Sequence, residues 1–233
     1  MKTLIIIPAY NEEKNILKTY KSIMKLKKYD CIVINDGSKD NTLNVLIENK
    51  IPHINLLENL GIGGAVQTGY KYAFENNYDI AVQFDGDGQH DASYIENIIK
   101  PIKEGESDFV IGSRFIDKSS SEFQSSSTRR VGIKLISSLI KFFTRKKIYD
   151  PTSGFRAANK NIIKKFAKYY PAEYPEPESS VYLLKNKFKI LEVPVSMNER
   201  SGGKSSIHSW KSVYYMINVS ISIFIESIKR GDL

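Results

Sequence analysis

The sequence predicts an α/β fold with a mostly parallel sheet and helices on both of its faces. Short runs made almost entirely of apolar residues recur through the first half of the chain. Segments with apolar residues at helical spacing stand between these runs, and polar, glycine-rich clusters follow each run directly. Strands that are apolar throughout are typical of parallel sheets, because helices cover both faces.

The expected elements alternate regularly along the chain. Apolar runs predict strands over 4–7, 31–34, 54–57, 80–84 and 108–112. Helical spacing predicts helices over 12–28, 41–50, 63–76 and 92–104. The serine-rich stretch 118–128 then predicts a flexible loop or lid, and two amphipathic helices are expected over 129–147 and 209–229.

Composition narrows the classes of partner. The 233 residues carry a formal charge of +8, which favours an anionic partner such as a phosphorylated ligand or an acidic membrane surface. The basic stretch 129–147 lacks an aromatic stacking platform, so we do not expect nucleic-acid binding. The single cysteine lies in an apolar run and is expected to pack in the core of a protein from a reducing compartment. No apolar run reaches the roughly 20 residues of a membrane span.

The segment DGDGQHD (85–91) is the first candidate for chemistry. Ligands of open parallel sheets bind beyond the carboxyl ends of the strands, and this segment follows the strand expected at 80–84. Asp85 and Asp87 would repel each other unless a cation held them together. Carboxylate oxygens suit Mg²⁺ or Mn²⁺, so the pair predicts metal or nucleotide binding. Asp91 is instead expected to cap the helix that follows.

Two further clusters follow strands. In NDGSKDNT (35–42), Asp36 stands where a carboxylate could accept hydrogen bonds from a base or ribose, whereas Ser38 or Asp40 is expected to cap the next helix. In NLGIGGAVQTG (59–69) the dinucleotide-binding fingerprint fails, because Val66 occupies the position of its third small residue. These glycines are expected to allow a tight turn or close approach of a ligand.

Seven motifs in order carry a family resemblance: IIIPAYNEE, INDGSKDNT, ENLGIGGAVQTGY, QFDGDGQHD, IGSRF, DPTSGFRAAN and EVPVSMNERSGGKSSI. Together they resemble the family 2 glycosyltransferases of GT-A fold, and most closely the dolichyl- and polyprenyl-phosphate sugar synthases. The resemblance covers nearly the whole chain. It implies a GT-A catalytic domain that takes a nucleotide sugar and a divalent metal, Mg²⁺ or Mn²⁺.

The resemblance also implies roles for particular residues. The nucleotide-sugar site would comprise Pro8, Ala9, Tyr10, Glu12, Asp36, Gly61, Asp85 and Gly86. Asp87 and Gln89 would coordinate the metal that bridges the diphosphate, so Asp85 and Asp87 count as catalytic. Arg200 would close on the donor diphosphate, and Arg114 and Arg130 would hold an acceptor phosphate.

The acceptor stays open between two chemistries. The oxygen of a lipid phosphate is already anionic and needs no strong base, whereas a sugar hydroxyl needs a carboxylate to take its proton. Glu176 and Glu178 are the candidates for that base. We expect an inverting, metal-dependent transfer of a hexose from a nucleotide sugar, preferably a UDP-sugar, to polyprenyl phosphate in cell-surface glycan synthesis. The alternatives are transfer to a hydroxyl of a lipid-linked or surface glycan, and a non-catalytic nucleotide-sugar-binding module.

The expected domain organisation is a catalytic domain over 1–208 and a C-terminal amphipathic helix over 209–233. That helix is expected to contact a membrane interface or a second copy of the chain. The basic helix over 129–147 either lies in a membrane interface or packs on the core with a solvated face. The expected location is cytoplasmic, on the inner face of the cell membrane.

Overall fold

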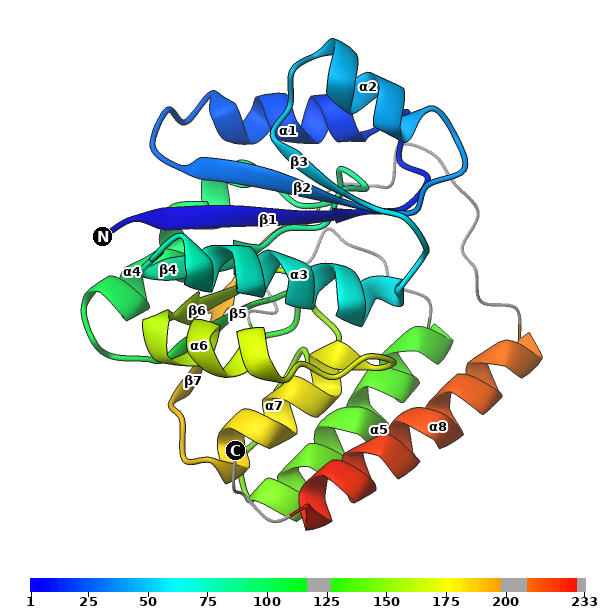
Figure 1. The fold of residues 1–233 in the computed structure, drawn as a ribbon. Helices are drawn as coiled ribbons and strands as arrows, with labels where there is room; N and C mark the ends of the chain where they lie inside the picture. The colour runs from blue at the N-terminus through cyan, green and yellow to red at the C-terminus, as the bar shows by residue number, and fades with distance from the viewer. Residues whose placement is uncertain (117–126, 198–208, 230–233) are drawn as a thin grey trace.

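A computed structural model describes residues 1–116, 127–197 and 209–229, which form a mixed α/β structure (Figure 1). The strands are β1 (Thr3–Ala9), β2 (Asp30–Asp36), β3 (His53–Leu56), β4 (Ile80–Gln83), β5 (Phe109–Ser113), β6 (Arg156–Asn159) and β7 (Ile190–Pro194). The helices are α1 (Ile16–Met24), α2 (Thr42–Glu48), α3 (Gly61–Glu75), α4 (Ile95–Lys103), α5 (Ser127–Thr144), α6 (Lys160–Lys168), α7 (Pro175–Lys185) and α8 (Ser209–Ile228), with a 3₁₀ turn, η1 (Ala92–Tyr94), before α4.

The strands form one seven-stranded sheet in the order β3-β2-β1-β4-β6-β5-β7. Strand β1 pairs in parallel with β2 and β4, β2 with β3, and β5 with β7. Strand β6 runs antiparallel to both of its neighbours, β4 and β5. The expected α/β class with a mostly parallel sheet is therefore confirmed, and one antiparallel strand joins its two parallel parts.

Helices cover both faces of the sheet. In β1, Ile5 and Ile7 pack with buried residues of α1, α2 and α4. Leu4 and Ile6 point to the other face and pack with α3, α6 and α7. Successive side chains of a strand alternate between faces, so a strand covered on both sides is apolar at every position. This is why the run at 4–7 contains no polar residue.

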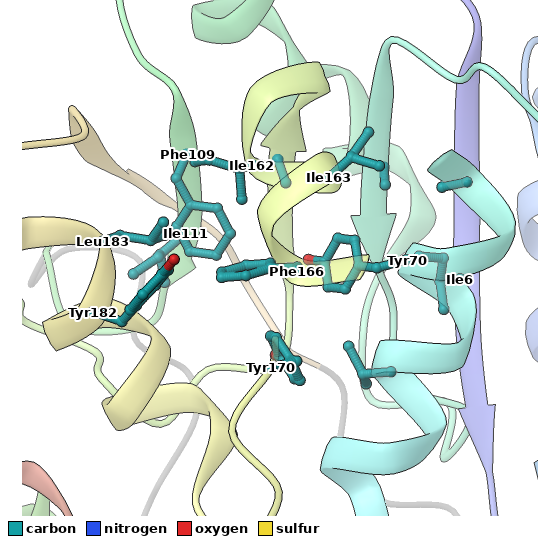
Figure 2. Close-up of a cluster of buried hydrophobic side chains, with 14 of the residues drawn as sticks. Ile6, Tyr70, Phe109, Ile111, Ile162, Ile163, Phe166, Tyr170, Tyr182 and Leu183 are labelled. Carbon is teal, nitrogen blue, oxygen red and sulfur yellow. The ribbon is translucent and has the colours of Figure 1, made fainter. Parts of the chain in front are cut away.

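A cluster of aromatic side chains ties the second half of the chain to the first (Figure 2). The ring of Phe166 on α6 lies 5.0 Å from the ring of Tyr70 on α3 and 4.8 Å from that of Tyr170, in edge-to-face geometry. The ring of Phe109 on β5 lies 6.0 Å away on another side. Such pairs add specific geometry to burial of large apolar surfaces. The cluster holds α6 between α3 and β5.

A layer of three helices, α5, α7 and α8, packs beside this core (Figure 1). Helix α8 contacts both α5 and α7, and its Val219 and Ile223 are fully buried. The segment expected to be a separate amphipathic helix thus shares a hydrophobic core with the rest of the chain. Among the described residues, no helix combines the length and the apolar character that crossing a membrane would require.

The structure adds elements that sequence analysis does not assign. Strand β6, helices α6 and α7 and strand β7 all lie between 150 and 197. Both strands are short, and α7 begins in the proline-containing segment PEPESS, so no clear periodicity marks these three elements. Helix α6 does carry apolar residues at helical spacing, Ile162, Ile163 and Phe166, which sequence analysis did not use. Most of the expected serine-rich loop, at 117–126, lies outside the described residues.

Candidate active site

A pocket of about 360 Å³ opens at the carboxyl ends of β1, β2 and β4, beside the beginning of α3. Its lining residues are Pro8, Ala9, Tyr10, Glu12, Asp36, Asn59, Gly61, Ile62, Ala65, Asp85, Gly86 and Asp87. All of the residues predicted to bind the nucleotide sugar are among them, although they come from four separate segments of the chain. The volume is within the range of small-molecule sites. The sheet edge therefore gathers these residues into one cavity.

Asp36 is fixed at the end of β2. Its carboxylate Oδ1 accepts a hydrogen bond from the backbone N–H of Leu60 at 2.7 Å, immediately before α3. Burial raises the pKa of Asp36, and the N–H groups of Leu60 and Gly61 oppose that rise. Gly37 has a φ of +64°, and a Cβ there would lie 2.7 Å from the backbone nitrogen of Asn59. The turn after β2 thus packs directly on the beginning of α3.

Asp85 is held in an ionised form. Its Oδ2 accepts a hydrogen bond from Nε2 of His90 at 3.0 Å, and its side chain is 33% exposed. Burial raises the pKa of Asp85, but hydrogen bonds from His90 and Gln83 and the positive charge of Arg114 outweigh burial and bring the pKa below its ordinary value. A carboxylate that stays charged at neutral pH suits contact with a cation or with a polar ligand.

Asp87 also lines this pocket, and its Oδ1 accepts a hydrogen bond from the backbone N–H of Gln89 at 3.0 Å. The described residues contain no group of three or more histidine, cysteine, aspartate or glutamate side chains that could enclose a metal. Mg²⁺ commonly binds through one or two carboxylates and completes its shell with substrate phosphates and water. Asp85 and Asp87 fit that kind of site. A metal bound there would stabilise charge on a diphosphate leaving group.

The capping prediction for Asp91 is confirmed, whereas the N-cap of α2 is Asn41 and neither Ser38 nor Asp40 occupies that position. Asp91 is the N-cap of η1, and its carboxylate accepts a hydrogen bond from the backbone N–H of Ser93 at 2.9 Å. Asp40 accepts one from the backbone N–H of Thr42 at 2.9 Å, at the beginning of α2. Ser38 instead accepts one from the backbone N–H of Asn11. Asp91 and Asp40 are thus structural, whereas Asp85 and Asp87 line the pocket.

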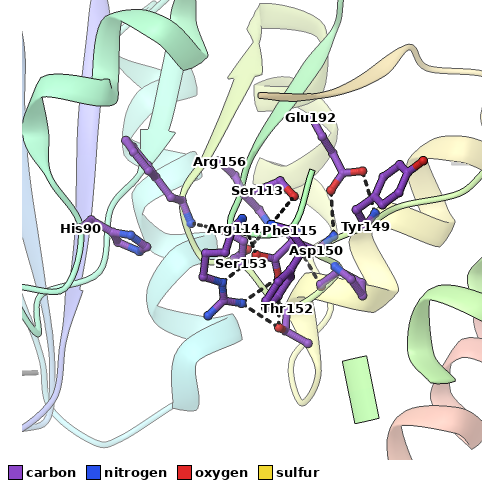
Figure 3. Close-up of polar contacts among 12 residues, drawn as sticks. His90, Ser113, Arg114, Phe115, Tyr149, Asp150, Thr152, Ser153, Arg156 and Glu192 are labelled. Carbon is purple, nitrogen blue, oxygen red and sulfur yellow. Dashed lines mark hydrogen bonds and ion pairs between the residues drawn. The ribbon is translucent and has the colours of Figure 1, made fainter. Parts of the chain in front are cut away.

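Arg114 is engaged in a buried ion pair (Figure 3). Its Nε and Nη2 each lie 2.7 Å from a carboxylate oxygen of Asp150, and Nη2 also lies 3.1 Å from Oγ1 of Thr152. An acceptor phosphate would have to compete with Asp150 for this guanidinium. Arg130 is exposed on α5, and neither arginine is among the pocket-lining residues. Arg200 lies outside the described residues.

The two candidate bases occupy different surroundings on α7. Burial raises the pKa of Glu176, the charge of Arg156 opposes that rise, and the charge of Asp85 adds to it. Burial also raises the pKa of Glu178, but the neighbouring charge that adds to it comes from Glu226 on α8. The pKa of Glu176 therefore depends on a pocket residue, Asp85, whereas the pKa of Glu178 depends on a residue of α8.

Three residues near the site were not singled out from the sequence: His90, Asp150 and Arg156. His90 is buried and bonded to Asp85. Arg156 is fully buried and donates to the backbone carbonyls of Pro151, Ser153 and Glu176. All three stand inside the motifs QFDGDGQHD and DPTSGFRAAN, which was the available signal. Their buried partners could not be read from the motifs alone.

Comparison with known proteins places the chain in a family. The model of the family described as "Glycosyl transferase family 2" matches residues 4–167. A UDP-N-acetylglucosamine–dolichyl-phosphate N-acetylglucosaminyltransferase of Methanococcus voltae is 35% identical over 211 residues, covering 82% of this chain and 83% of the relative. The dolichol-phosphate mannosyltransferase of Pyrococcus furiosus is 30% identical over 218 residues, covering 89% of this chain and 59% of that protein.

Solved structures agree on the fold. The glucosyl-3-phosphoglycerate synthase of Mycobacterium tuberculosis, crystallised with UDP, superposes with a TM-score of 0.71 at 18% identity, covering 97% of this chain and 80% of that one. The same enzyme crystallised with Mn²⁺ and UDP-glucose superposes with a TM-score of 0.70, covering 97% of this chain and 78% of that one. The family match, the relatives and the sheet topology together show that the chain is a family 2 glycosyltransferase of GT-A fold, close to the polyprenyl-phosphate sugar synthases.

Proposed function

We propose that this enzyme transfers a sugar from a UDP-sugar to polyprenyl phosphate, with inversion at the anomeric carbon and with Mg²⁺ or Mn²⁺ as cofactor. The observation that supports it most is the pocket, because it brings Asp36, Asp85 and Asp87 together at one sheet edge. Asp36 is placed to contact the nucleoside, and Asp85 and Asp87 are placed to face a metal-bound diphosphate. UDP as the nucleotide is supported by the Methanococcus voltae relative, whose name specifies UDP-N-acetylglucosamine.

A lipid phosphate as acceptor is supported by the relatives named for dolichyl or polyprenyl phosphate. Its oxygen is already anionic, so transfer needs stabilisation of the leaving diphosphate more than it needs a base. A cation at Asp85 and Asp87 supplies that stabilisation, and Arg200 is proposed to add to it from the donor side. Arg130, which is exposed on the basic helix α5, is proposed to contact the acceptor phosphate.

A hydroxyl acceptor is the second candidate, and Glu176 favours it. A base with a raised pKa is suited to taking a proton near neutral pH, and burial raises the pKa of Glu176. The charge of Asp85 adds to that rise, which supports a role for Glu176 near the donor site. Under this alternative Glu176 takes the proton of a sugar hydroxyl on a lipid-linked or surface glycan.

We also propose peripheral attachment to the inner face of the cell membrane through α5 and α8. Exposed apolar side chains recur on one stripe of each helix: Val131, Leu135 and Phe142 on α5, and Tyr214, Ile217, Ile221, Phe224 and Ile228 on α8. Ring contacts from Phe142 through Phe143 to Phe224 link the stripes. Basic residues of 130–147 are exposed beside them, a combination that suits anionic lipid. Association with a second copy of the chain is the alternative use of this surface.

The direct test is a transfer assay with purified protein. UDP- and GDP-sugars are each incubated with Mn²⁺ or Mg²⁺, with and without polyprenyl phosphate, and nucleotide diphosphate release and the mass of any lipid product are recorded. A glycosylated phospholipid that forms only with a UDP-sugar, metal and lipid would support the proposal. Donor turnover on a glycan hydroxyl, abolished by Glu176→Gln, would support the alternative. Failure of every donor would refute both.

A further inference from the structure

The carboxylate of Asp85 is confined by two groups that do not line the pocket. The first is Nε2 of His90, which lies 3.0 Å from Oδ2. The second group is the backbone of Gly154, where a Cβ atom would lie only 2.5 Å from Oδ2 and 2.6 Å from Oδ1. Real Cβ atoms do not approach other atoms so closely, so the carboxylate occupies space that exists because residue 154 is glycine.

His90 is directed at Asp85 and at no other polar group that the structure describes. The imidazole is buried, with its ring 5.3 Å from the ring of Phe84 and 5.0 Å from that of Phe155. Its second nitrogen, Nδ1, is buried and has no hydrogen-bond partner among the described residues. Since an ionised carboxylate only accepts hydrogen bonds, Nε2 carries the proton in the contact with Asp85. A phenylalanine or leucine would satisfy the apolar surroundings better, so the hydrogen bond is what histidine adds.

Gly154 is presented by a turn that buried arginines hold in place. Arg114 binds the carboxylate of Asp150 at the beginning of the turn with two hydrogen bonds of 2.7 Å. Arg156 donates from Nη2 to the carbonyl of Pro151 at 3.0 Å and from Nε to that of Ser153 at 2.5 Å. Both guanidinium groups are buried. The turn at 150–154, which places Gly154 against Asp85, is therefore held by buried hydrogen bonds at both ends.

We propose that His90 and Gly154 form a carboxylate clamp that positions Asp85 for donor binding and turnover. His90 is a positioning residue, because it acts through Asp85, and Gly154 in the turn at 150–154 completes the clamp by limiting the space around the carboxylate. Arg114 and Arg156 contribute by holding that turn. The proposal deepens the proposed function, and rests on it in taking Asp85 as part of the nucleotide-sugar site.

Two substitutions at His90 separate the hydrogen bond from the packing. His90→Leu fills the apolar surroundings and removes the donor, whereas His90→Gln keeps an N–H donor. Removing a residue that hydrogen-bonds to a ligand-binding side chain typically lowers ligand affinity or activity by roughly 10- to 100-fold. We expect His90→Leu to weaken binding of UDP with Mn²⁺, measured by calorimetry, and to lower kcat/KM by that factor, and His90→Gln to retain most of both. Equal losses in the two variants, or losses that only follow the melting temperature, would overturn the hydrogen-bonding half of the proposal.

Gly154→Ala tests the other half of the clamp. Gly154 is not among the glycines with positive φ, so alanine fits the backbone, and the new methyl group meets the carboxylate of Asp85. In a crystal structure of this variant we expect both carboxylate oxygens to have retreated to at least 3.0 Å from the new Cβ. UDP–Mn²⁺ affinity should fall about tenfold or more. The matched control is Gly132→Ala on α5, where the new Cβ meets the flexible side chain of Met216 at 3.1 Å and affinity should not change.

The two proposals fail separately. If the wild-type protein transfers no sugar, the proposed function is refuted, but the crystal structure of Gly154→Ala still decides the clamp. A carboxylate that stays in place with its wild-type bond to His90, through adjustment of the turn at 150–154 alone, would overturn the clamp even in an active enzyme.

Discussion

The ion pair between Arg114 and Asp150 lends itself to a quantitative prediction. The arginine side chain is 4% exposed and the aspartate side chain 0% exposed. Two hydrogen bonds of 2.7 Å join the side chains, and the backbone N–H of Arg114 adds a third to the same carboxylate at 3.1 Å. Replacing one partner of such a pair leaves the other charge buried without compensation, which costs about 3–5 kcal/mol.

We therefore expect Arg114→Met to lower the free energy of unfolding by about 3–5 kcal/mol, a large share of the roughly 5–15 kcal/mol typical of folded proteins. Urea unfolding followed by circular dichroism measures the change. Because the main cost is the charge left behind, Arg114→Met combined with Asp150→Leu should lose less than the sum of the two single variants.

Lys103→Met is the matched control. Its Nζ lies 2.8 Å from Oε1 of Glu96, but the two side chains are 36% and 46% exposed. Solvent screens such a pair, so the loss should not exceed about 1 kcal/mol. If Arg114→Met instead changes stability as little as Lys103→Met and raises KM for polyprenyl phosphate, the structural reasoning is refuted and Arg114 binds the acceptor.

Three further predictions concern the metal, pH and the membrane. Asp87→Ala should lower metal-dependent turnover by about a hundredfold or more, because a bound cation supplies several kcal/mol of charge stabilisation, with little change in melting temperature; near-normal turnover would remove the metal assignment. Burial and Glu226 raise the pKa of Glu178 above 4.5, so the contribution of Glu178 to wild-type stability should fall as pH rises from 4.5 through the raised value. Urea unfolding at about pH 4 and pH 7 measures the free energy of unfolding of Glu178→Gln relative to wild type. This relative stability should be greater at about pH 7 than at about pH 4, and an equal value at both pH values would contradict the prediction. Phe142→Asp should release the protein from anionic vesicles in flotation assays, whereas Ile47→Asp, exposed on α2 across the sheet, should not; equal binding of both would favour association between copies.

Local sequence was enough for the first half of the fold. The expected strands at 4–7, 31–34, 54–57, 80–84 and 108–112 all lie within or overlap β1 to β5. These strands could be recognised from the sequence because helices bury both faces of the sheet, so each strand is a continuous run of apolar residues. Most of the pocket-lining residues could be predicted for a related reason. Parallel strands end at the same edge of the sheet, so polar residues that directly follow such strands come together.

Only the tertiary structure decided how the second half completes the site. No local pattern shows that β6 inserts antiparallel between β4 and β5, or that Asp150 is the partner of Arg114 across 36 residues of chain. Nor does the segment PEPESS reveal that the charge of Asp85 contributes to the raised pKa of Glu176, whereas the charge of Glu226 on α8 contributes to that of Glu178. Periodicity and motifs report which residues a segment must bury or expose, because those depend on the segment itself. The partner of a buried charge depends instead on which distant segment packs against it, and that is settled only when the whole chain has folded.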